Sequence, residues 1–530
     1  MADPALVGVG DAADPIEPLA DGERPGRAWR RGAARNATAN GVARIVSIGT
    51  SFVLTPLILT AVGTDAYGLW VLIGSIVAYA SLLDLGIGGA VTKYVAEHRA
   101  RDETTAARAV IGTGLRLYLA LGAAIALIGV VISPLIPQWL GVPPDLAGTA
   151  TATTAAMSIG LGIAIPCTTA TAVLRGLQRY DVAASISIVG SLLSAGLTLV
   201  ALALGWGIVG IVVVGIPIPV ITQALAFAAV RRVAPDLTTG PRPTVPGTAR
   251  RIFGFSWPLF LLDVAGRLQA KSDEIVVGVV LSLGAVTPYA LGRKLAAIPR
   301  LLAEQFAMVL LPRASELDAA AEHARLRSLY LGGVRVSLGL AMPLTVCLVL
   351  LAGPILDVWV GPGFDDGAPV VGILAIAAIV DLSLWPAGFV LQGIARHRWL
   401  GPISMGSGIA NLVLSIALAP TLGIVGVAIG TLIPALVEAV VVLTPYTLRT
   451  LGLGPRRFLG EALAPAVLPV IPAVIAIRLV EQVIAPDSIL ALVVTVAAAH
   501  AAYLAPYLLF PSAAPERRLV RDLIGGRRAR

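Results

Sequence analysis

Residues 257–304 read WPLFLLDVAGRLQAKSDEIVVGVVLSLGAVTPYALGRKLAAIPRLLAE, and this stretch decides how the rest of the chain is interpreted. It is apolar enough to lie in a membrane, yet it carries nine ionisable side chains in 48 residues. They are Asp263, Arg267, Lys271, Asp273, Glu274, Arg293, Lys294, Arg300 and Glu304. A charge at the centre of a bilayer costs about 2.5–3.5 kcal/mol on the insertion scale. Most of these side chains must therefore face water, a partner or the membrane surface, which indicates a functional segment.

The composition places the whole chain in the membrane class. Of its 530 residues, 57% are hydrophobic and 13% are charged, whereas soluble domains hold about 45–50% apolar and about 25% charged residues. The apolar residues form runs long enough to cross a bilayer as helices, and they do not alternate as barrel strands would. Cys167 and Cys347 lie in separate apolar runs, so they predict no metal site and no disulfide framework. We expect an all-α polytopic membrane protein.

The apolar runs predict about fourteen transmembrane helices. They fall at 38–62, 67–91, 109–133, 147–174, 182–204, 208–230, 252–282, 285–312, 329–352, 369–391, 401–419, 424–448, 461–484 and 488–510. The two tails and the connections after the even-numbered spans hold thirty of the 39 Lys and Arg residues, and the other connections hold none. The positive-inside rule predicts that both termini are cytoplasmic. The basic balance is therefore a topology signal and not a nucleic-acid footprint.

An internal repeat divides the chain into two halves. The segment from Pro134 to Asp145, with Trp139 and Gly141, returns 220 residues later from Pro354 to Asp365, with Trp359 and Gly361. Two bundles of six spans, each with an even number of crossings, predict a pseudo-twofold axis along the membrane normal and a cavity between the bundles.

The repeat and the composition together predict six segments. They are a disordered cytoplasmic tail at 1–36, an N-terminal six-helix bundle at 37–230, a cytoplasmic linker at 231–251, a C-terminal six-helix bundle at 252–448, an extra helix pair at 449–510 and a basic cytoplasmic tail at 511–530. The first tail has no apolar core, so it is not a signal peptide.

Five cations within the spans are candidates for binding a substrate anion. Arg44 and Arg267 occupy corresponding places in the repeat, and a guanidinium keeps its charge and binds phosphate oxygens in pairs. The alternative for both is snorkelling to the membrane surface. Arg293, Lys294 and Arg300 form a polar stripe with Glu304 that predicts a cavity lining. Arg116 and Arg335, also matched by the repeat, are expected near the cytoplasmic mouth.

Five carboxylates are candidates for ion coupling: Asp84, Asp263, Glu304, Asp381 and Glu438. A desolvated carboxylate can titrate near neutral pH and so carry H⁺ or Na⁺. The alternative is a structural ion pair, and Asp263 is one helical turn from Arg267. Since no nucleotide-binding loop, metal cluster or nucleophile motif is present, we expect no cofactor and no enzymatic activity. Transport must then use an ion gradient, the membrane potential or the substrate gradient.

The order of several short motifs resembles a known family. They are Asn36, Thr55-Pro-Leu57, Gly63, Tyr67-Gly-Leu-Trp70, Leu83-Asp-Leu-Gly86, Lys93-Tyr-Val-Ala-Glu97, Phe255-Ser-Trp-Pro-Leu-Phe260, Tyr289-Ala-Leu291 and Leu311-Pro-Arg313. This pattern, over about residues 36 to 450, resembles bacterial polysaccharide-biosynthesis membrane proteins. These are oligosaccharide flippases of the multidrug/oligosaccharidyl-lipid/polysaccharide exporter superfamily.

The resemblance implies what the protein transports and where. It implies a bacterial plasma membrane protein with two lobes that alternate in opening, a polyprenyl-diphosphate-linked oligosaccharide as cargo, and envelope polysaccharide assembly proteins as partners. Contact with membrane lipid is expected, and nucleic acid is not. An ion-coupled drug antiporter of the same superfamily is the alternative, although Arg44 and Arg267 would repel cationic drugs. A polyprenol-dependent glycosyltransferase would need a large outer domain, which the short outer connections exclude.

Overall fold

The computed structural model describes residues 27–518 except 85, 241, 242, 244 and 301–308. At 27–38, 83, 255–263, 265, 266 and 268–270 only the backbone is described. Two sequence candidates, Asp263 and Glu304, fall on these positions, so their side chains lie outside the described residues. Every regular element of the described part is helical.

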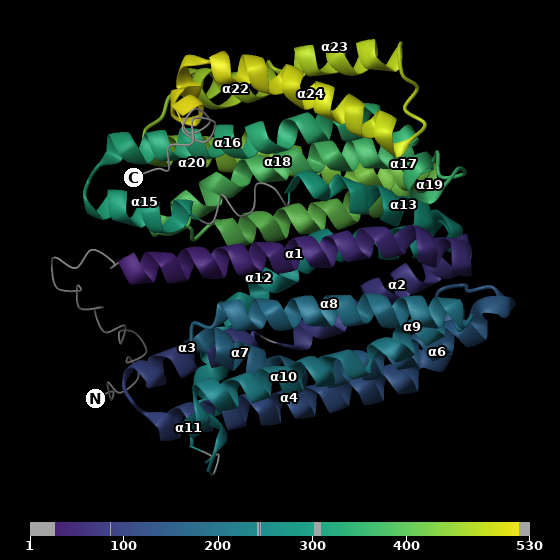
Figure 1. Ribbon diagram of the computed structural model, residues 1–530, viewed down its shortest axis with the longest axis vertical. Helices are drawn as coiled ribbons and strands as arrows, with labels where there is room; N and C mark the ends of the chain where they lie inside the picture. The colour runs from purple at the N-terminus through teal and green to yellow at the C-terminus, as the bar shows by residue number, and fades with distance from the viewer. Residues whose placement is uncertain (1–26, 85, 241–242, 244, 301–308, 519–530) are drawn as a thin grey trace, which may run out of the picture.

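The first half of the chain forms one group of helices, at the bottom of Figure 1. Its elements are α1 (Arg27–Val62), α2 (Thr64–Ala80), α3 (Ile87–Ala100), α4 (Thr104–Ile132), α5 (Ile136–Trp139), α6 (Pro144–Ala164), α7 (Thr169–Gly176), α8 (Tyr180–Ala203), α9 (Gly207–Gly215), α10 (Pro217–Val233) and α11 (Pro235–Thr238). Helix α1 begins inside the segment 1–36 that was predicted to be disordered.

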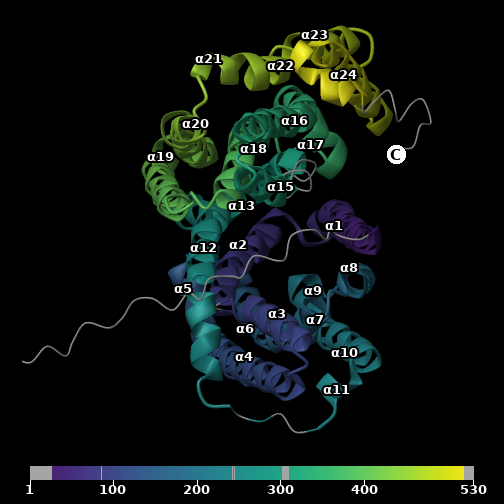
Figure 2. The same cartoon turned by 90° about the vertical axis from the view of Figure 1, so that its left-hand side faces the viewer.

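The second half lies above the first in Figures 1 and 2, except for its first helix, which runs down beside the first half. Its elements are α12 (Thr248–Val276), α13 (Leu283–Ala296), α15 (Leu310–Ala319), α16 (His323–Leu350), α17 (Ala352–Val360), α18 (Gly367–Gly393), α19 (Leu400–Leu436) and α20 (Thr444–Leu451). The additional C-terminal elements are α21 (Pro455–Phe458), α22 (Ala464–Val467), α23 (Val470–Glu481) and α24 (Ile489–Leu509), which pack on α16 at the edge of the molecule.

Ten helices in the described part are long and apolar enough to cross a membrane. The prediction of an all-helical multi-span membrane protein is confirmed, while the number fourteen stays a prediction. One of the ten, Leu400–Leu451, has a break at Gly423, where φ is +61°. This break separates the two spans that were predicted at 401–419 and 424–448.

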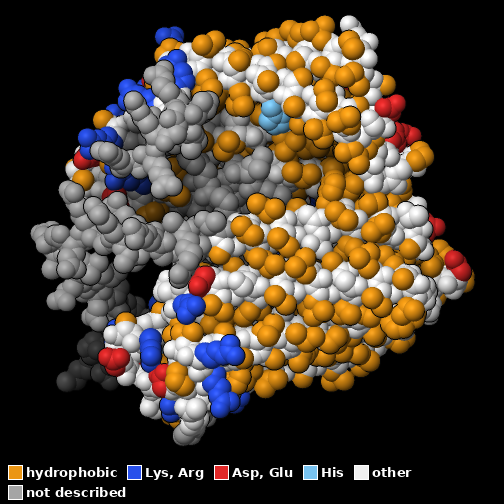
Figure 3. All heavy atoms as spheres, in the orientation of Figure 1, with side chains coloured by type: hydrophobic (Ala, Val, Ile, Leu, Met, Phe, Trp, Pro, Cys, Tyr) orange, Lys and Arg blue, Asp and Glu red, His pale blue; other side chains and the backbone are white. Residues whose placement is uncertain are grey.

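Hydrophobic side chains cover the middle of the face seen in Figure 3, and Lys and Arg side chains gather at its left-hand end. We call this end, where α1 begins, the basic end. Its cations include Arg99, Arg101, Arg175, Arg231, Arg313, Arg396 and Arg449. The opposite end, which we call the far end, has turns at Gly63, Gly141, Gly205 and Gly361, all with positive φ. The distribution follows the charge asymmetry that the sequence shows.

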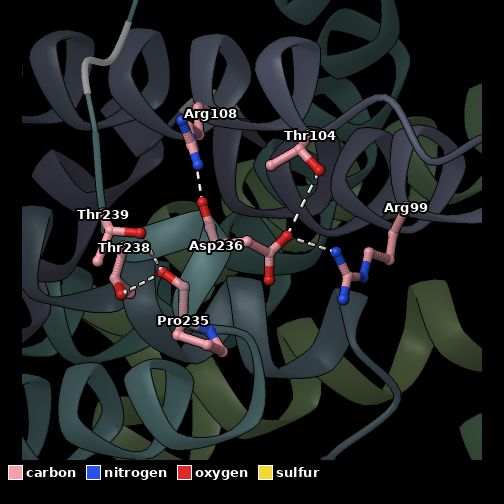
Figure 4. A network of polar contacts seen from close by, with 7 residues as sticks. All are labelled: Arg99, Thr104, Arg108, Pro235, Asp236, Thr238 and Thr239. Carbon is pink, nitrogen blue, oxygen red and sulfur yellow. Dashed lines mark hydrogen bonds and ion pairs between the residues drawn. The ribbon is translucent and has the colours of Figure 1, made fainter.

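The connection between the halves is fixed to the first half at the basic end. Asp236 of α11 accepts hydrogen bonds from Arg99 and Thr104 through its carboxylate, and from Arg108 through its backbone carbonyl at 2.6 Å (Figure 4). The start of α12 is held beside the first half by the Tyr94 hydroxyl, which donates to the Arg251 carbonyl at 3.3 Å. Further along, α12 packs against α2 on one side and α19 on the other, so it joins both halves.

The halves meet near the far end. The indole of Trp359 stacks on Phe52 with ring centroids 4.2 Å apart, and its Nε1 donates to the Phe52 carbonyl at 3.0 Å. Helix α2 also lies directly on α13, since a Cβ atom on Gly68 would be 2.3 Å from the Leu283 carbonyl oxygen. One buried apolar cluster, including Tyr67 and Tyr289, continues across this contact.

Arg335, expected near the cytoplasmic mouth, lies on α16 against the C-terminal segment. Its side chain is buried against the C-terminal segment, where Nη2 lies 2.7 Å from Glu516 Oε1 and Nη1 donates to the Glu461 carbonyl at 3.1 Å. The partner carboxylate comes from residues far along the chain, which sequence spacing does not indicate. Arg335 therefore attaches the C-terminal elements to α16.

Candidate functional site

A cavity of about 1470 Å³ lies within the first half of the chain, between α1, α3, α7, α8 and α10. Its volume exceeds the roughly 300–1,000 Å³ of ordinary small-molecule sites. The lining extends from Asn40 and Tyr180 near the basic end to Ile58 and Ile211 near the far end. Among the described lining residues, Lys294 is the single one from the second half. The cavity is therefore built mainly by one half and touched by the other.

Hydroxyl groups line this cavity in two stripes. On α1 they are Ser47, Thr50, Ser51 and Thr55, and on α8 they are Ser187, Ser191, Ser194 and Thr198. Spacings of three and four residues place each set on one face of its helix. A hydroxyl both donates and accepts hydrogen bonds, as a sugar hydroxyl does. Some of this capacity serves the helices themselves, since Thr55 Oγ1 donates to the Ser51 carbonyl at 2.7 Å.

The charged lining residues are mostly cationic. Arg44, Arg175 and Lys294 line the cavity together with one carboxylate, Asp84, among the residues that the structure describes. Asp84 closes a short 3₁₀ turn between α2 and α3, and Gly86 follows with φ of +71°. Such a break is accessible to glycine because it lacks a Cβ atom. The break places the Asp84 carboxylate in the cavity, where it accepts a hydrogen bond from the Tyr118 hydroxyl.

Lys294 reaches from α13 to α1. Its Nζ donates to the Ser51 carbonyl at 3.1 Å and to Thr55 Oγ1. Three of the ten sequence candidates, Arg44, Lys294 and Asp84, thus share one cavity.

Arg267 and Arg293 lie outside the described lining of the cavity. Arg267 is half-buried between α12 and α2, where Nη1 donates to the Ala78 carbonyl at 3.1 Å. Its own carbonyl accepts from the Tyr79 hydroxyl at 3.4 Å. Arg293 forms an ion pair with the buried Glu274. Both arginines therefore contribute to packing around α12.

The remaining three described candidates lie together in the second half. Arg300 Nη1 is 3.3 Å from Asp381 Oδ2, and the guanidinium lies 4.6 Å from the centroid of the Trp385 ring. Glu438 accepts a hydrogen bond from Ser404 at 3.3 Å. Arg300 and Asp381 are both more than a third exposed, so this pair resembles a surface ion pair more than a buried one.

A largely buried polar cluster surrounds Asp273 of α12. Its Oδ2 accepts hydrogen bonds from the Tyr289 hydroxyl at 2.8 Å and from Thr431 Oγ1 at 2.9 Å. Asn411 Nδ2 donates to the same Thr431 oxygen at 2.8 Å. Asp273 Oδ1 and Glu274 Oε2 are buried and have no hydrogen-bond partner among the described residues. Such atoms are costly in an apolar interior and call for a proton, a cation or water.

The sequence placed Asp273 and Glu274 in a charged stretch but did not select either of them as an ion site. It gave no sign of the cluster because Thr431 and Asn411 are neutral and lie more than 130 residues away. The one feature of the sequence that could have indicated this cluster is that its members are polar residues within apolar spans.

The chain is similar in sequence to two named proteins. The chain is 23% identical over 488 residues to the uncharacterized membrane protein EpsK of Bacillus subtilis (strain 168). This alignment covers 88% of this chain and 94% of EpsK. It is 25% identical over 405 residues to the probable flippase AglR of Haloferax volcanii, covering 72% of this chain and 76% of AglR.

A solved structure of the lipid II flippase MurJ, in an inward closed conformation, has the same fold. It superposes with a TM-score of 0.67 at 13% identity, over 92% of this chain and 99% of MurJ. The sequence profile of the polysaccharide biosynthesis proteins matches residues 62–369, which include most of the motifs that suggested this resemblance. With more than half of its length matched and a fold shared with MurJ, the chain belongs to the polysaccharide biosynthesis protein family.

Proposed function

We propose that the protein is a flippase that moves a lipid-linked oligosaccharide across the bacterial plasma membrane by alternating access. The observation that carries this proposal is the cavity in the first half, which combines cations with two hydroxyl stripes. Arg44 and Lys294 meet the diphosphate, because charge-assisted hydrogen bonds to phosphate are strong. The hydroxyls of α1 and α8 meet the sugars. The names of AglR, a probable flippase, and MurJ, a lipid II flippase, support the same activity.

The charge of the cavity separates this proposal from a drug antiporter. Three cations and one carboxylate line it among the described residues, and that carboxylate, Asp84, already bonds to Tyr118. A cationic drug would meet net repulsion here, whereas a diphosphate would be attracted. The lipid tail of the cargo stays in the bilayer beside the cavity.

A coupling cation, H⁺ or Na⁺, is assigned to the Asp273 cluster. The residues fit such an ion, since a buried carboxylate with an unpartnered oxygen stands beside hydroxyl and amide groups. Hard cations prefer oxygen ligands of this kind. The cation would supply a positive charge that neutralises Asp273. This site replaces the five carboxylates chosen from the sequence as the first candidate.

Transport by a reconstituted protein tests the flippase proposal. Purified protein in liposomes is supplied with an undecaprenyl diphosphate carrying a fluorescent sugar, and a membrane-impermeant quencher reports which leaflet holds it. Arg44→Gln is expected to slow transport at least about ten-fold, the effect of losing one charge-assisted contact. Arg116→Gln is the matched control, because Arg116 is a span cation that does not line the cavity. Wild-type rates in Arg44→Gln, or transport of a cationic dye instead, would contradict the proposal.

A further inference from the structure

Lys294 connects the two halves of the molecule at the wall of the cavity. It belongs to the last turn of α13, and its two hydrogen bonds end on the Ser51 carbonyl and Thr55 Oγ1 of α1. Thr55 is buried, and its hydroxyl also donates to the Ser51 carbonyl at 2.7 Å. The ammonium group therefore closes a three-centre contact that attaches the second half to the first.

This ammonium group has no counter-ion among the described residues, since its hydrogen-bond partners there are a carbonyl and a hydroxyl. A half-buried cation within a membrane is poorly stabilised by neutral acceptors alone. An ammonium carries three donors, of which α1 uses two. The same side chain lines the cavity, so an anion in the cavity can reach it. A diphosphate would offer Lys294 a better partner than α1 does.

Lys294 and Arg44 are positioned to act on one ligand. Arg44 and Ser51 are seven residues apart on α1, which is two helical turns, so they share a face and are separated by roughly 10 Å along the axis. Both line the cavity. A diphosphate with its first sugar can extend over this distance. Arg44 approaches from the first half and Lys294 from the second.

We propose that Lys294 is a substrate-released latch between the halves. An anionic group bound in the cavity takes the ammonium from Ser51 and Thr55, which breaks the contact between α13 and α1. Part of the binding energy of the anion then favours separation of the halves. A ligand shifts a conformational equilibrium only if it binds one state more tightly than the other, and here the anion binds the unlatched state more tightly. This inference rests on the proposed function, and it assigns to Lys294 a role that Arg44 does not have.

Two substitutions should change affinity in opposite directions. The probe is farnesyl diphosphate, with farnesol as the uncharged control, and binding to the purified full-length protein is measured by calorimetry. Lys294→Met removes the anion ligand, so we expect at least about ten-fold weaker binding. Thr55→Val removes the competing acceptor but keeps the lysine. We expect binding about three- to ten-fold tighter, because the anion then has to break one hydrogen bond of Lys294 to α1 in place of two.

Matched controls separate the latch from general effects on packing. Thr55→Ser keeps the hydroxyl and should bind as the wild type does. Tyr67→Phe removes a phenol within hydrogen-bonding reach of Thr55 and leaves the lysine contact intact, so affinity should not change. The latch is overturned if Lys294→Met binds the probe more weakly but Thr55→Val binds it no more tightly than the wild type. Lys294 would then be an anion ligand only.

The separation of the halves gives a second readout. Spin labels at Asp145 and Asp365, exposed and matched by the internal repeat, report the distance between the halves at the far end. Farnesyl diphosphate should shift this distance in the wild type and in Lys294→Arg, but not in Lys294→Met. An equal shift in Lys294→Met would overturn the latch while leaving the flippase proposal intact. Failure of the wild type to bind farnesyl diphosphate at all would count against the flippase proposal itself.

Discussion

At the scale of single residues, Asp273 makes the sharpest prediction. Its carboxylate is buried, and Oδ1 has no partner among the described residues. Asp273→Asn keeps the shape and the contacts with Tyr289 and Thr431 but removes the charge that would hold a cation. We expect transport by this variant to lose its dependence on an imposed Na⁺ or H⁺ gradient, with at least about a ten-fold lower driven rate. The measurement is the fluorescent-lipid assay with and without each gradient.

Glu438→Gln is the control for this prediction. Glu438 is another carboxylate of the second half, but it is half-buried and bonds to Ser404 outside the Asp273 cluster. Its loss should leave gradient dependence unchanged. Gradient-driven transport that survives in Asp273→Asn and disappears in Glu438→Gln would move the ion site to Glu438.

Three candidates chosen from the sequence line the cavity, whereas the partners of these side chains were not predicted. Arg44, Asp84 and Lys294 were identified because a charge in an apolar span is costly and therefore informative. Arg267 was expected in the cavity as well, yet it packs against the Ala78 carbonyl of α2. Which face of a helix points to a cavity depends on how neighbouring helices pack, and the small residues throughout this chain do not reveal that.

At the scale of helices, hydropathy indicated the apolar spans, and prolines interrupt two of them. Predicted spans at 147–174 and 208–230 are each interrupted, since α7 follows a short turn at Pro166 and α10 begins at Pro217. Proline lacks a backbone N–H and disrupts the helical hydrogen bonds before it. The hydropathy of a run is not changed by one proline. The sequence therefore predicted that these spans exist but did not predict that each is divided into two helices.

Helices α4 and α6 give a prediction at this scale. They cross where Gly122 faces Gly162, and a Cβ atom on Gly122 would be 2.2 Å from the Gly162 carbonyl oxygen. Close backbone approach through small residues is a principal source of helix association in membranes. Gly122→Ala should therefore separate α4 from α6 and lower the melting temperature of the purified protein in detergent. The expected cost is about 1–3 kcal/mol, as for other overpacked sites.

Gly196→Ala is the comparison for Gly122→Ala. Gly196 lies inside α8, and a Cβ atom there would meet nothing within 4 Å. Alanine is also the better helix former, so this variant should be as stable as the wild type or slightly more stable. Equal melting temperatures for the two alanine variants would show that the α4–α6 contact yields without cost.

At the scale of the whole molecule, the halves are joined near the far end while the cavity extends toward the basic end. The far-end contact includes the Phe52–Trp359 stack and the close approach of Gly68 to Leu283. A segment repeat in the sequence predicted two related halves, and its motif contains Trp359. The contact of Trp359 with Phe52 could not be predicted, because the repeat relates residues by position in each half and not across the interface.

The proposed alternating access requires the far-end contact to open during each cycle, and a reversible cross-link tests this requirement. Phe52→Cys and Trp359→Cys are combined with Cys167→Ser and Cys347→Ala, and the pair is joined by a short bis-methanethiosulfonate. Transport should fall to the level of empty liposomes, because the halves can no longer part, and dithiothreitol should restore it. Binding of farnesyl diphosphate should persist in the linked protein, since Arg44 remains accessible. A link between Arg478→Cys and Glu481→Cys, one turn apart on α23 with native side chains 2.8 Å apart, should leave transport unchanged. If the linked Phe52–Trp359 pair still transports at the unlinked rate, the halves need not separate at this end, and the cargo must cross by another route.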